Sequence, residues 1–146
     1  MTQEWMFPNY VKTLDRASKY LFSQYGGVII FDIDDTLILQ PENKTIPETI
    51  FFYDLTKNMG FTPVIITARP GFSENVDRTI EELKSFGITG FEYIFFMPNG
   101  EKDPYRYKLN ARKNVYDIYG GNIVMSVGDM PWDVGQYGGY SVLLQK

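Results

Sequence analysis

The sequence predicts an α/β fold, a three-layer sandwich in which helices cover both faces of a mostly parallel five-stranded sheet. Apolar runs of strand length alternate along the chain with stretches whose apolar residues recur at helical spacing. The runs are continuous, without alternation of apolar and polar residues, which indicates strands buried on both faces. The connections are short, so we expect a single domain over residues 1–146.

The first half of the chain divides into a helix, a strand and a second helix. Apolar residues at helical spacing after Pro8 predict the first helix, and residues 28–33 have the composition of a fully buried strand. Residues 37–44 are expected to form a loop. Thr45-Ile46-Pro47-Glu48 has the pattern of a capping box with proline in the first turn, so we expect a helix from there to Gly60.

The second half of the chain begins with a buried strand over residues 62–66 and supplies three more strands after it. Ser73 is expected to cap a helix with Val76, Ile80 and Leu83 on its apolar face. The remaining elements are, in order, an aromatic-rich strand over residues 91–96, a helix over 108–119 and two short strands over 123–127 and 140–144. This order predicts a Rossmann-like sheet, in which ligands bind beyond the carboxyl ends of the strands.

The composition excludes several classes of chemistry. The 146 residues include no cysteine and no histidine, so disulfides, zinc sites built on these residues and a Ser-His-Asp triad are impossible. Acid–base catalysis must use Asp, Glu, Lys or Tyr. The formal net charge is −4, so a phosphate-bearing substrate must be held by local positive charge or by a metal.

The sequence carries no sign of membrane targeting. Residues 1–10 lack the basic-then-apolar pattern of a signal peptide. No apolar run reaches the roughly 18 residues that a membrane span requires. We therefore expect a soluble, cytoplasmic protein without membrane contact.

Carboxylates follow the first predicted strand directly. Asp32 and Asp34 are two residues apart, so an extended backbone would project both side chains from one face. Carboxylates crowded at the end of a buried strand repel one another. A divalent metal with oxygen ligands would offset that repulsion, and the pair therefore predicts a metal site.

Polar side chains also follow two other strands. Thr67 and Arg69 come after the second strand, and Asp129 and Asp133 come after the strand that ends at Val127. Each group alone is explained by a helix cap, an Asx turn or a surface position. Their common placement at the carboxyl ends of parallel strands is not explained in that way, and it predicts one shared pocket.

Four motifs, in order, resemble those of the haloacid dehalogenase (HAD) superfamily of phosphohydrolases. Asp32-Ile33-Asp34-Asp35-Thr36 resembles its Asp-x-Asp-x-Thr motif, and Thr67 resembles the Thr or Ser that closes the next strand. Lys108 is similar to its phosphate-binding lysine, and Gly128-Asp129 with Asp133 resembles its Gly-Asp-x-x-x-Asp motif. The resemblance extends from the first strand to the last.

A finer resemblance is to the plant acid phosphatase and vegetative storage protein branch and its bacterial class B-like relatives. Tyr107-Lys108 with Arg112 is similar to the Tyr-Lys-x-x-x-Arg of that branch, and Thr67-Ala68-Arg69 to its second motif. Trp132 lies inside the last motif, as it does in the branch. This chain lacks the cysteines of the branch, so the resemblance does not extend to a particular substrate.

The resemblance implies a mechanism without histidine. Asp32 would attack phosphorus and form an aspartyl-phosphate, and Asp34 would act as general acid and then as general base. Because Asp34 must be neutral when the leaving group departs, a raised pKa is expected for it. The implied cofactor is Mg²⁺, held by Asp32, the backbone carbonyl of Asp34, Asp129 and Asp133.

The remaining candidates concern the substrate. Thr67 and Lys108 are expected to bind the phosphoryl group. Arg69 is expected to contact phosphate or leaving group, and Arg112 to contact substrate or to orient Lys108 or an acidic ligand. The segments after the first two strands are too short for a large cap domain, so we expect a HAD-like fold with a minimal cap or none.

An open site admits a phosphorylated small molecule or macromolecule, unless a second subunit of a homo-oligomer covers it. The loop at residues 98–107 could stack Tyr105 and Tyr107 on bases, although an ordinary turn-rich surface loop explains it as well. The negative net charge disfavours nucleic acid as a partner.

Four functions are therefore compared. The leading one is a Mg²⁺-dependent phosphomonoesterase, and the second is a phosphatase of nucleic-acid 3′ ends. The third is a receiver-like domain phosphorylated on Asp, disfavoured because its phospho-acceptor follows a later strand. The fourth is a non-catalytic storage or binding protein on the HAD fold, against which the presence of both Asp32 and Asp34 argues.

Overall fold

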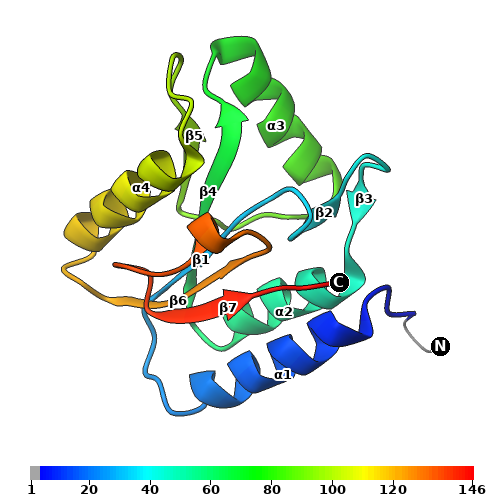
Figure 1. Ribbon diagram of the computed structural model, residues 1–146. Coiled ribbons are helices and arrows are strands. Elements are labelled where there is room, and N and C mark those ends of the chain that lie inside the picture. The colour runs from blue at the N-terminus through cyan, green and yellow to red at the C-terminus, as the bar shows by residue number, and fades with distance from the viewer. Residues whose placement is uncertain (1–3) are drawn as a thin grey trace.

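The computed structural model describes residues 4–146, and its centre is a five-stranded sheet with the strand order β5-β4-β1-β6-β7 (Figure 1). All neighbouring strands are parallel. The strands are β1 (Val28–Phe31), β4 (Thr62–Pro70), β5 (Tyr93–Met97), β6 (Ile123–Gly128) and β7 (Tyr140–Leu143). From β1 the chain first extends the sheet through β4 to β5 and then returns to the other side of β1 with β6. The loops after β1 and β6 therefore diverge, which is where an open α/β sheet forms its binding crevice.

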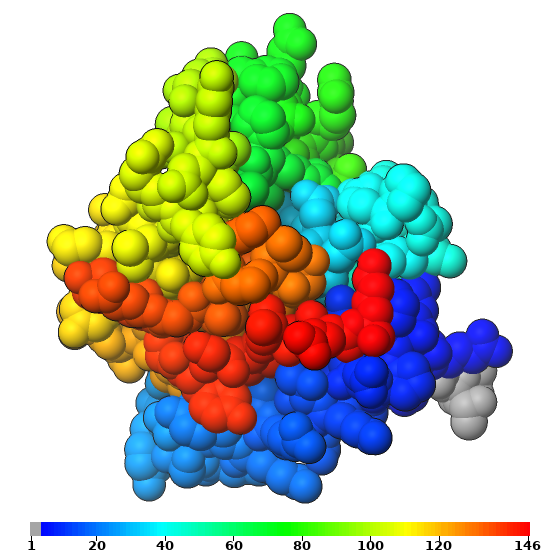
Figure 2. All heavy atoms as spheres, in the orientation of Figure 1, coloured from blue at the N-terminus to red at the C-terminus, as the bar shows by residue number. Residues whose placement is uncertain are grey.

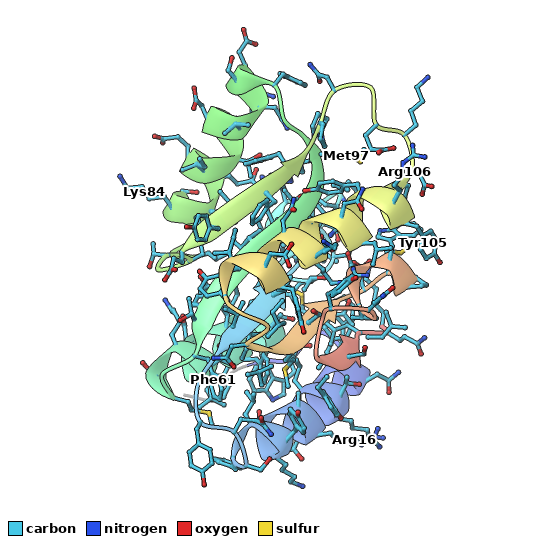
Figure 3. The ribbon with its side chains drawn as sticks, turned by 90° about the vertical axis from the view of Figure 1, so that its left-hand side faces the viewer. Arg16, Phe61, Lys84, Met97, Tyr105 and Arg106 are labelled. Carbon is cyan, nitrogen blue, oxygen red and sulfur yellow. The ribbon has the colours of Figure 1, made fainter. Side chains whose placement is uncertain are left out.

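Helices cover both faces of the sheet, as predicted. The helices are α1 (Pro8–Leu21), α2 (Pro47–Asn58), α3 (Ser73–Ser85) and α4 (Pro104–Ile118). The first three lie on one face and α4 lies alone on the other (Figure 1). Figure 3 shows the first turn of α4, marked by Tyr105 and Arg106, at the opposite end of the sheet from Phe61, which precedes β4.

The continuous apolar sequence of β1 is explained by burial on both sides. Ile29 and Phe31 pack into the cluster shared with α1, α2 and α3. Val28 and Ile30 point the other way and pack against Ala111 and other residues of α4. All four strand residues are buried, so β1 is held rigidly in the middle of the molecule and fixes the position of the residues that follow it.

Three predicted segment boundaries are wrong. Strand β4 runs to Pro70, four residues beyond its predicted end, so Thr67 and Arg69 lie within the strand and not after it. Residues 37–44 are not a simple loop, because β2 (Ile38–Leu39) and β3 (Lys44–Thr45) pair as a small antiparallel hairpin whose first strand is buried. Helix α4 begins at Pro104, four residues earlier than predicted. The side chain of Asp103 caps it by accepting hydrogen bonds from the backbone N–H groups of the second and third helical residues.

The predicted caps of α2 and α3 are also wrong. Ile46 occupies the N-cap of α2 without a side-chain hydrogen bond, and the carboxylate of Glu48 instead accepts a hydrogen bond from the backbone N–H of Phe7. In α3 the cap position is Phe72, and Ser73 is the first helical residue. Ile80, expected on the apolar face of α3, is exposed. Among residues 4–146, no helix combines the length and the apolarity needed to cross a bilayer.

Candidate functional site

The three strand-end groups partly converge at the carboxyl edge of the sheet. Asp32 follows β1, Asp129 follows β6, and Asp133 lies on the short 3₁₀ turn η1 (Pro131–Asp133) just beyond. One carboxylate oxygen from each of these three residues lies within 4.8 Å of the others. The structure thus brings together three of the four aspartates that the sequence singled out. Asp34 lines the same cleft, which has a volume of about 340 Å³, without joining the cluster.

Lys108 provides positive charge at the centre of this cluster. Its ammonium group is almost fully buried and donates hydrogen bonds to Asp32 Oδ1 at 3.0 Å, Asp133 Oδ1 at 2.6 Å and the carbonyl of Ile66 at 2.7 Å. Burial lowers the pKa of Lys108, but the charges of Asp32 and Asp133 outweigh burial and raise it. The lysine therefore stays protonated between the two carboxylates.

One lysine does not balance three carboxylates. Burial and the neighbouring charge of Asp32 raise the pKa of Asp129 to about 8 and that of Asp133 to about 6. The part of each shift that comes from the charge of Asp32 is anionic repulsion, which a divalent cation would relieve. Several closely spaced carboxylate oxygens are the donors that Mg²⁺ prefers, so the residues present fit this metal.

Thr36 is a member of the site that sequence reasoning left without a role. Its hydroxyl lies 3.3 Å from Asp32 Oδ2 and 3.3 Å from Asp129 Oδ1, and the side chain is fully buried. The hydroxyl thereby links the carboxylate after β1 to the one after β6. The signal for this role was its place at the end of the Asp-x-Asp-x-Thr motif.

Asp34 is held in its charged form, contrary to expectation. Arg69 Nε and Nη2 donate to its two oxygens at 2.9 and 2.7 Å, and the side-chain amide of Gln40 donates at 2.9 Å. Burial raises the pKa of Asp34, but the hydrogen bonds and charge of Arg69 reverse the effect, and the pKa lies below its usual value. The raised pKa expected from the sequence is therefore wrong for the substrate-free protein. The expectation rests on the anionic neighbours of Asp34, whereas the contact with Arg69 decides the direction of the shift.

Arg69 is shared between two carboxylates. Besides Asp34, its Nη2 lies 3.0 Å from Glu82 Oε1 on α3, and Nη1 lies 3.3 Å from Thr79 Oγ1. Sequence reasoning missed Glu82, because nothing in the periodicity of α3 shows which acidic residue faces the strand ends. Arg69 lines the cleft, so contact with a phosphate stays a prediction.

Thr67 lies within β4, which continues to Pro70, and is buried. Its oxygen accepts a hydrogen bond from the backbone N–H of Arg69 at 3.1 Å. No acceptor for its hydroxyl hydrogen is found within residues 4–146. The hydroxyl is thus able to donate to a phosphoryl oxygen, and the predicted phosphate-binding role stays a prediction.

Arg112 holds the segment that carries Asp133. It lies one helical turn after Lys108, is buried, and donates from Nε to the carbonyl of Gln136 at 2.9 Å and from Nη1 to the carbonyl of Trp132 at 2.6 Å. These bonds on either side of Asp133 fix the loop after β6. Such an arrangement orients an acidic ligand, while contact between Arg112 and a substrate stays a prediction.

The proposed base-stacking loop loses most of its support. Residues from Pro104 onward belong to α4, and the ring of Tyr107 is buried against the sheet, where it cannot stack on a base. Arg106 is paired with Glu101 at 2.7 Å. Tyr105 is exposed and packs edge-to-face on Trp132, which lines the cleft.

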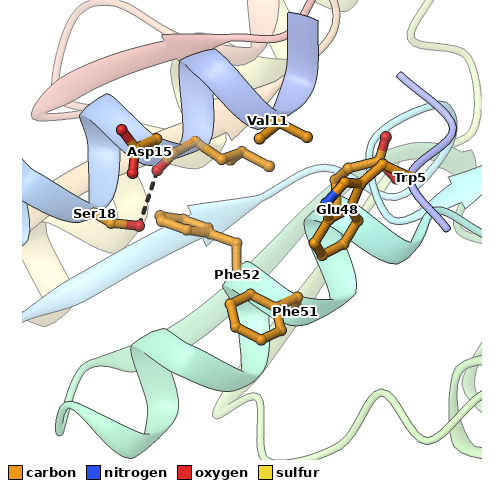
Figure 4. Close-up of a pocket in the computed structure, with 8 residues that line it drawn as sticks. Trp5, Val11, Asp15, Ser18, Glu48, Phe51 and Phe52 are labelled. Carbon is orange, nitrogen blue, oxygen red and sulfur yellow. Dashed lines mark hydrogen bonds between the residues drawn. The ribbon is translucent and has the colours of Figure 1, made fainter. Parts of the chain in front are cut away.

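A more apolar hollow lies elsewhere, between α1 and α2. It has a volume of about 140 Å³ and is lined by aromatic residues that include Trp5, Phe51 and Phe52 (Figure 4). Its polar lining consists of Asp15, Ser18 and Glu48, without any cation. The arrangement offers no nucleophile beside a charge-stabilising group, so the carboxylate cluster is the better candidate for catalysis.

Comparison with known proteins agrees with the geometry. A family model described as HAD superfamily, subfamily IIIB (acid phosphatase) matches residues 37–139. The match includes Thr67, Lys108, Asp129 and Asp133. It begins after Asp32 and Asp34, so the assignment of these two residues to the first motif rests on their position in the structure. Vegetative storage protein 1 of Arabidopsis thaliana is 30% identical over 130 residues, which cover 70% of this chain and 47% of that protein.

The chain thus spans about half the length of this curated relative. The family match, in contrast, covers well over half of the chain and includes β4 and β6, although β1 lies before it. The parallel sheet, its strand order and the aspartate cluster at its carboxyl edge are all consistent with it. This chain belongs to the acid phosphatase subfamily IIIB of the haloacid dehalogenase superfamily.

Proposed function

We propose that this protein is a Mg²⁺-dependent phosphomonoesterase that acts through an aspartyl-phosphate on Asp32. The observation that carries the proposal is the meeting of Asp32, Asp129 and Asp133 around the buried ammonium of Lys108. It supports a centre that holds a cation and a phosphoryl group together. Subfamily membership supports the choice of a phosphomonoester as substrate.

The metal would be held by Asp32, the backbone carbonyl of Asp34, Asp129 and Asp133. When bound, Mg²⁺ supplies electrophilic stabilisation of the phosphoryl oxygens. Thr36 keeps the carboxylates of Asp32 and Asp129 in register, and Arg112 keeps the loop of Asp133 in place. The protein therefore fixes the ligand geometry before any metal binds.

In the first half-reaction a carboxylate oxygen of Asp32 bonds to phosphorus while the bond from phosphorus to the ester oxygen breaks. Asp34 donates a proton to the departing oxygen, so the product is a neutral alcohol. Lys108 and the hydroxyl of Thr67 stabilise the charge on the non-reacting phosphoryl oxygens. In the second half-reaction water attacks the aspartyl-phosphate, Asp34 takes its proton, and phosphate leaves with Asp32 restored.

Asp34 can act as an acid only after its ion pair with Arg69 weakens. A dianionic phosphate entering the cleft competes with the carboxylate for the guanidinium, because bidentate binding suits both anions. Transfer of Arg69 to the substrate would remove the interaction that keeps the pKa of Asp34 low. Substrate binding would thereby prepare Asp34 for protonation.

The test is phosphate release from nucleotides, sugar phosphates and 3′-phosphorylated oligonucleotides, each with Mg²⁺ and with EDTA. We expect release from small phosphomonoesters only with Mg²⁺, and none from the Asp32→Asn variant. Asp54→Asn is the matched control, since Asp54 is an exposed carboxylate on α2 whose partner is Lys57. Retained turnover by Asp32→Asn would refute the covalent route, and preference for oligonucleotides would favour the nucleic-acid alternative.

The competing non-catalytic proposal draws on the name of the relative, a vegetative storage protein. It predicts no phosphate release from any substrate in either condition. The presence of Asp32 in the cluster and of Asp34 beside it supports the enzymatic proposal over this one. The same screen distinguishes the two.

A further inference from the structure

Three adjoining hollows run from the aspartate cluster to the exposed side of α1. The cleft of about 340 Å³ shares Asp129 with a hollow of about 270 Å³ that Tyr10 and residues 144–146 line. That hollow shares Gln145 with an outer one of about 330 Å³. Figure 2 shows the C-terminal segment, in red, between the orange segment after β6 and the blue helix α1.

Hydrogen bonds join the walls of these hollows. The hydroxyl of Tyr10, in the middle hollow, donates to the carbonyl of Asp35 at 2.8 Å, and Asp35 lines the catalytic cleft. The side-chain amide of Asn9, in the outer hollow, donates to the carbonyl of Lys146 at 3.2 Å. The three hollows adjoin through the shared residues Asp129 and Gln145, and we call them together the α1 groove, with the catalytic cleft at its inner end. Lys146, which lines the middle hollow, pairs with Asp35 of the cleft at 3.5 Å.

The outer end of the α1 groove is positively charged. Two of the six residues that line it are cations, Lys12 and Arg16, which lie one helical turn apart and are exposed; Figure 3 labels Arg16 on α1. Neither forms an ion pair within 4.0 Å with any acidic side chain of residues 4–146. Lys19, on the next turn, differs because it pairs with Asp15 at 3.2 Å and lies outside the groove.

We propose that the α1 groove binds a second phosphate on the leaving part of the substrate. The proposal rests on the proposed function and narrows its substrate class to phosphomonoesters whose alcohol carries another phosphate. The chain is acidic overall, so a second anionic group is held only where unpaired cations face it, and Lys12 and Arg16 supply them. Helical rise from Tyr10, in the middle hollow, to Arg16 places these cations up to about 9 Å farther along α1 from the cleft. The two phosphates are therefore separated by an extended spacer.

The experiment compares alkanediol bisphosphates of increasing chain length with alkyl monophosphates of the same length, at fixed Mg²⁺. For each length, kcat/KM for release of the first phosphate is measured for both substrates. We expect the bisphosphate to be preferred by about tenfold at the best length, mainly through a lower KM, and the preference to fall as salt is added. The preference for the bisphosphate should peak at an intermediate spacer length, because shorter spacers do not bring the second phosphate to Lys12 and Arg16.

Substitutions on α1 then test whether Lys12 and Arg16 cause the preference for the bisphosphate. Lys12→Gln combined with Arg16→Gln should bring the preference close to unity and leave kcat/KM for monophosphates unchanged. Lys19→Gln removes the same charge from the same helix and should keep the preference. Lys12→Arg combined with Arg16→Lys keeps both charges and should also keep the preference for the bisphosphate. This variant shows whether the loss in the neutralised variant comes from the missing charge or from a disturbed fold.

The outcomes are distinguishable. Hydrolysis of monophosphates without preference for any bisphosphate would overturn the groove proposal and leave the proposed function standing. A preference that survives in the doubly neutralised variant would overturn it as well. Absence of hydrolysis in both series would refute the proposed function and, with it, this inference.

Discussion

Arg69 and Asp34 form a bidentate ion pair at the carboxyl edge of the sheet, with nitrogen–oxygen distances of 2.9 and 2.7 Å. The pair joins the second predicted motif to the first. It stabilises the anionic form of the residue that we propose as the general acid. In the proposed mechanism this pair is a resting state, and the arginine would have to change partner before Asp34 donates a proton.

Substitution Arg69→Gln is the first test of this relationship. Without the guanidinium the pKa of Asp34 should rise, since burial is then opposed only by the hydrogen bond from Gln40 and the charge of Lys108. The protonated acid is needed for poor leaving groups, so the alkaline limb of the pH–rate profile for alkyl phosphates should move upward by about one unit or more. The rate at optimal pH should still fall, because a phosphate contact is lost.

The control for this prediction is Arg78→Gln, which removes an exposed arginine from the same side of the sheet on α3. It should leave the profile unchanged. 4-Nitrophenyl phosphate, whose leaving group needs no proton, should show the loss of rate without the shift of the alkaline limb. An unshifted limb with alkyl phosphates would mean that Asp34 is not the acid.

Lys108→Met tests the balance of charge in the cluster. The substitution leaves Asp32 and Asp133 buried without their shared cation, so we expect a loss of about 3–5 kcal/mol in the free energy of unfolding in EDTA. Mg²⁺ should restore part of that loss, because it compensates the same carboxylates. Urea denaturation with EDTA and with Mg²⁺ measures both effects.

Lys113→Met is the matched control, since Lys113 lies on the same helix but is exposed and pairs with the exposed Asp117 at 3.4 Å. It should change stability by less than about 0.5 kcal/mol in either condition. Equal destabilisation of the two variants in EDTA would show that the charge of Lys108 does not stabilise the cluster. Phosphatase activity should be lost in Lys108→Met alone.

The sheet could be predicted from the sequence because each central strand is a continuous apolar run. Val28 to Phe31 are buried on both faces, so their composition alone distinguishes this strand from an amphipathic one. The hairpin at residues 38–45 escaped prediction because its strands have only two residues each, too few to show a period. The early start of α4 could have been found from Asp103-Pro104, a cap followed by proline in the first turn.

The candidate site could be predicted as far as topology determines it. Asp32 and Asp129 follow adjacent parallel strands, so the strand order alone brings them together. The ion pair of Asp34 with Arg69 was beyond prediction, because a long side chain can turn toward several neighbours. Glu82 was missed for the same reason, as its contact depends on the rotation of α3 about its axis.

Stability of the metal-free protein should depend on pH through the aspartate cluster. The pKa of Asp129 is raised from 3.8 to about 8, and that of Asp133 to about 6, so the folded protein retains protons that the unfolded chain releases. Stability in EDTA should therefore fall as pH increases from about 4 to about 8, by up to about 1.4 kcal/mol per pH unit for each proton retained.

Thermal melting across this pH range, in EDTA and in Mg²⁺, measures the effect. Saturating Mg²⁺ should remove most of the decline, because the cation binds the ionised carboxylates of the folded state only. Asp129→Asn should flatten the EDTA curve, since it removes the most strongly shifted group. A curve in EDTA that rises over the same range would contradict the proposed crowding of charge.

Arg112→Lys tests whether the loop after β6 is positioned from α4. Lysine keeps the charge but cannot reach the carbonyls of Gln136 and Trp132 together, so the segment that carries Asp133 should lose its fixed position. Because the residues that orient metal ligands affect metal affinity strongly, we expect the affinity for Mg²⁺ to fall by about tenfold or more. Titration calorimetry with Mg²⁺ measures this change, and kcat at saturating Mg²⁺ should recover most of its original value. If Arg112 contacts the substrate instead, KM will rise while the affinity for Mg²⁺ stays the same, and the positioning role will be refuted.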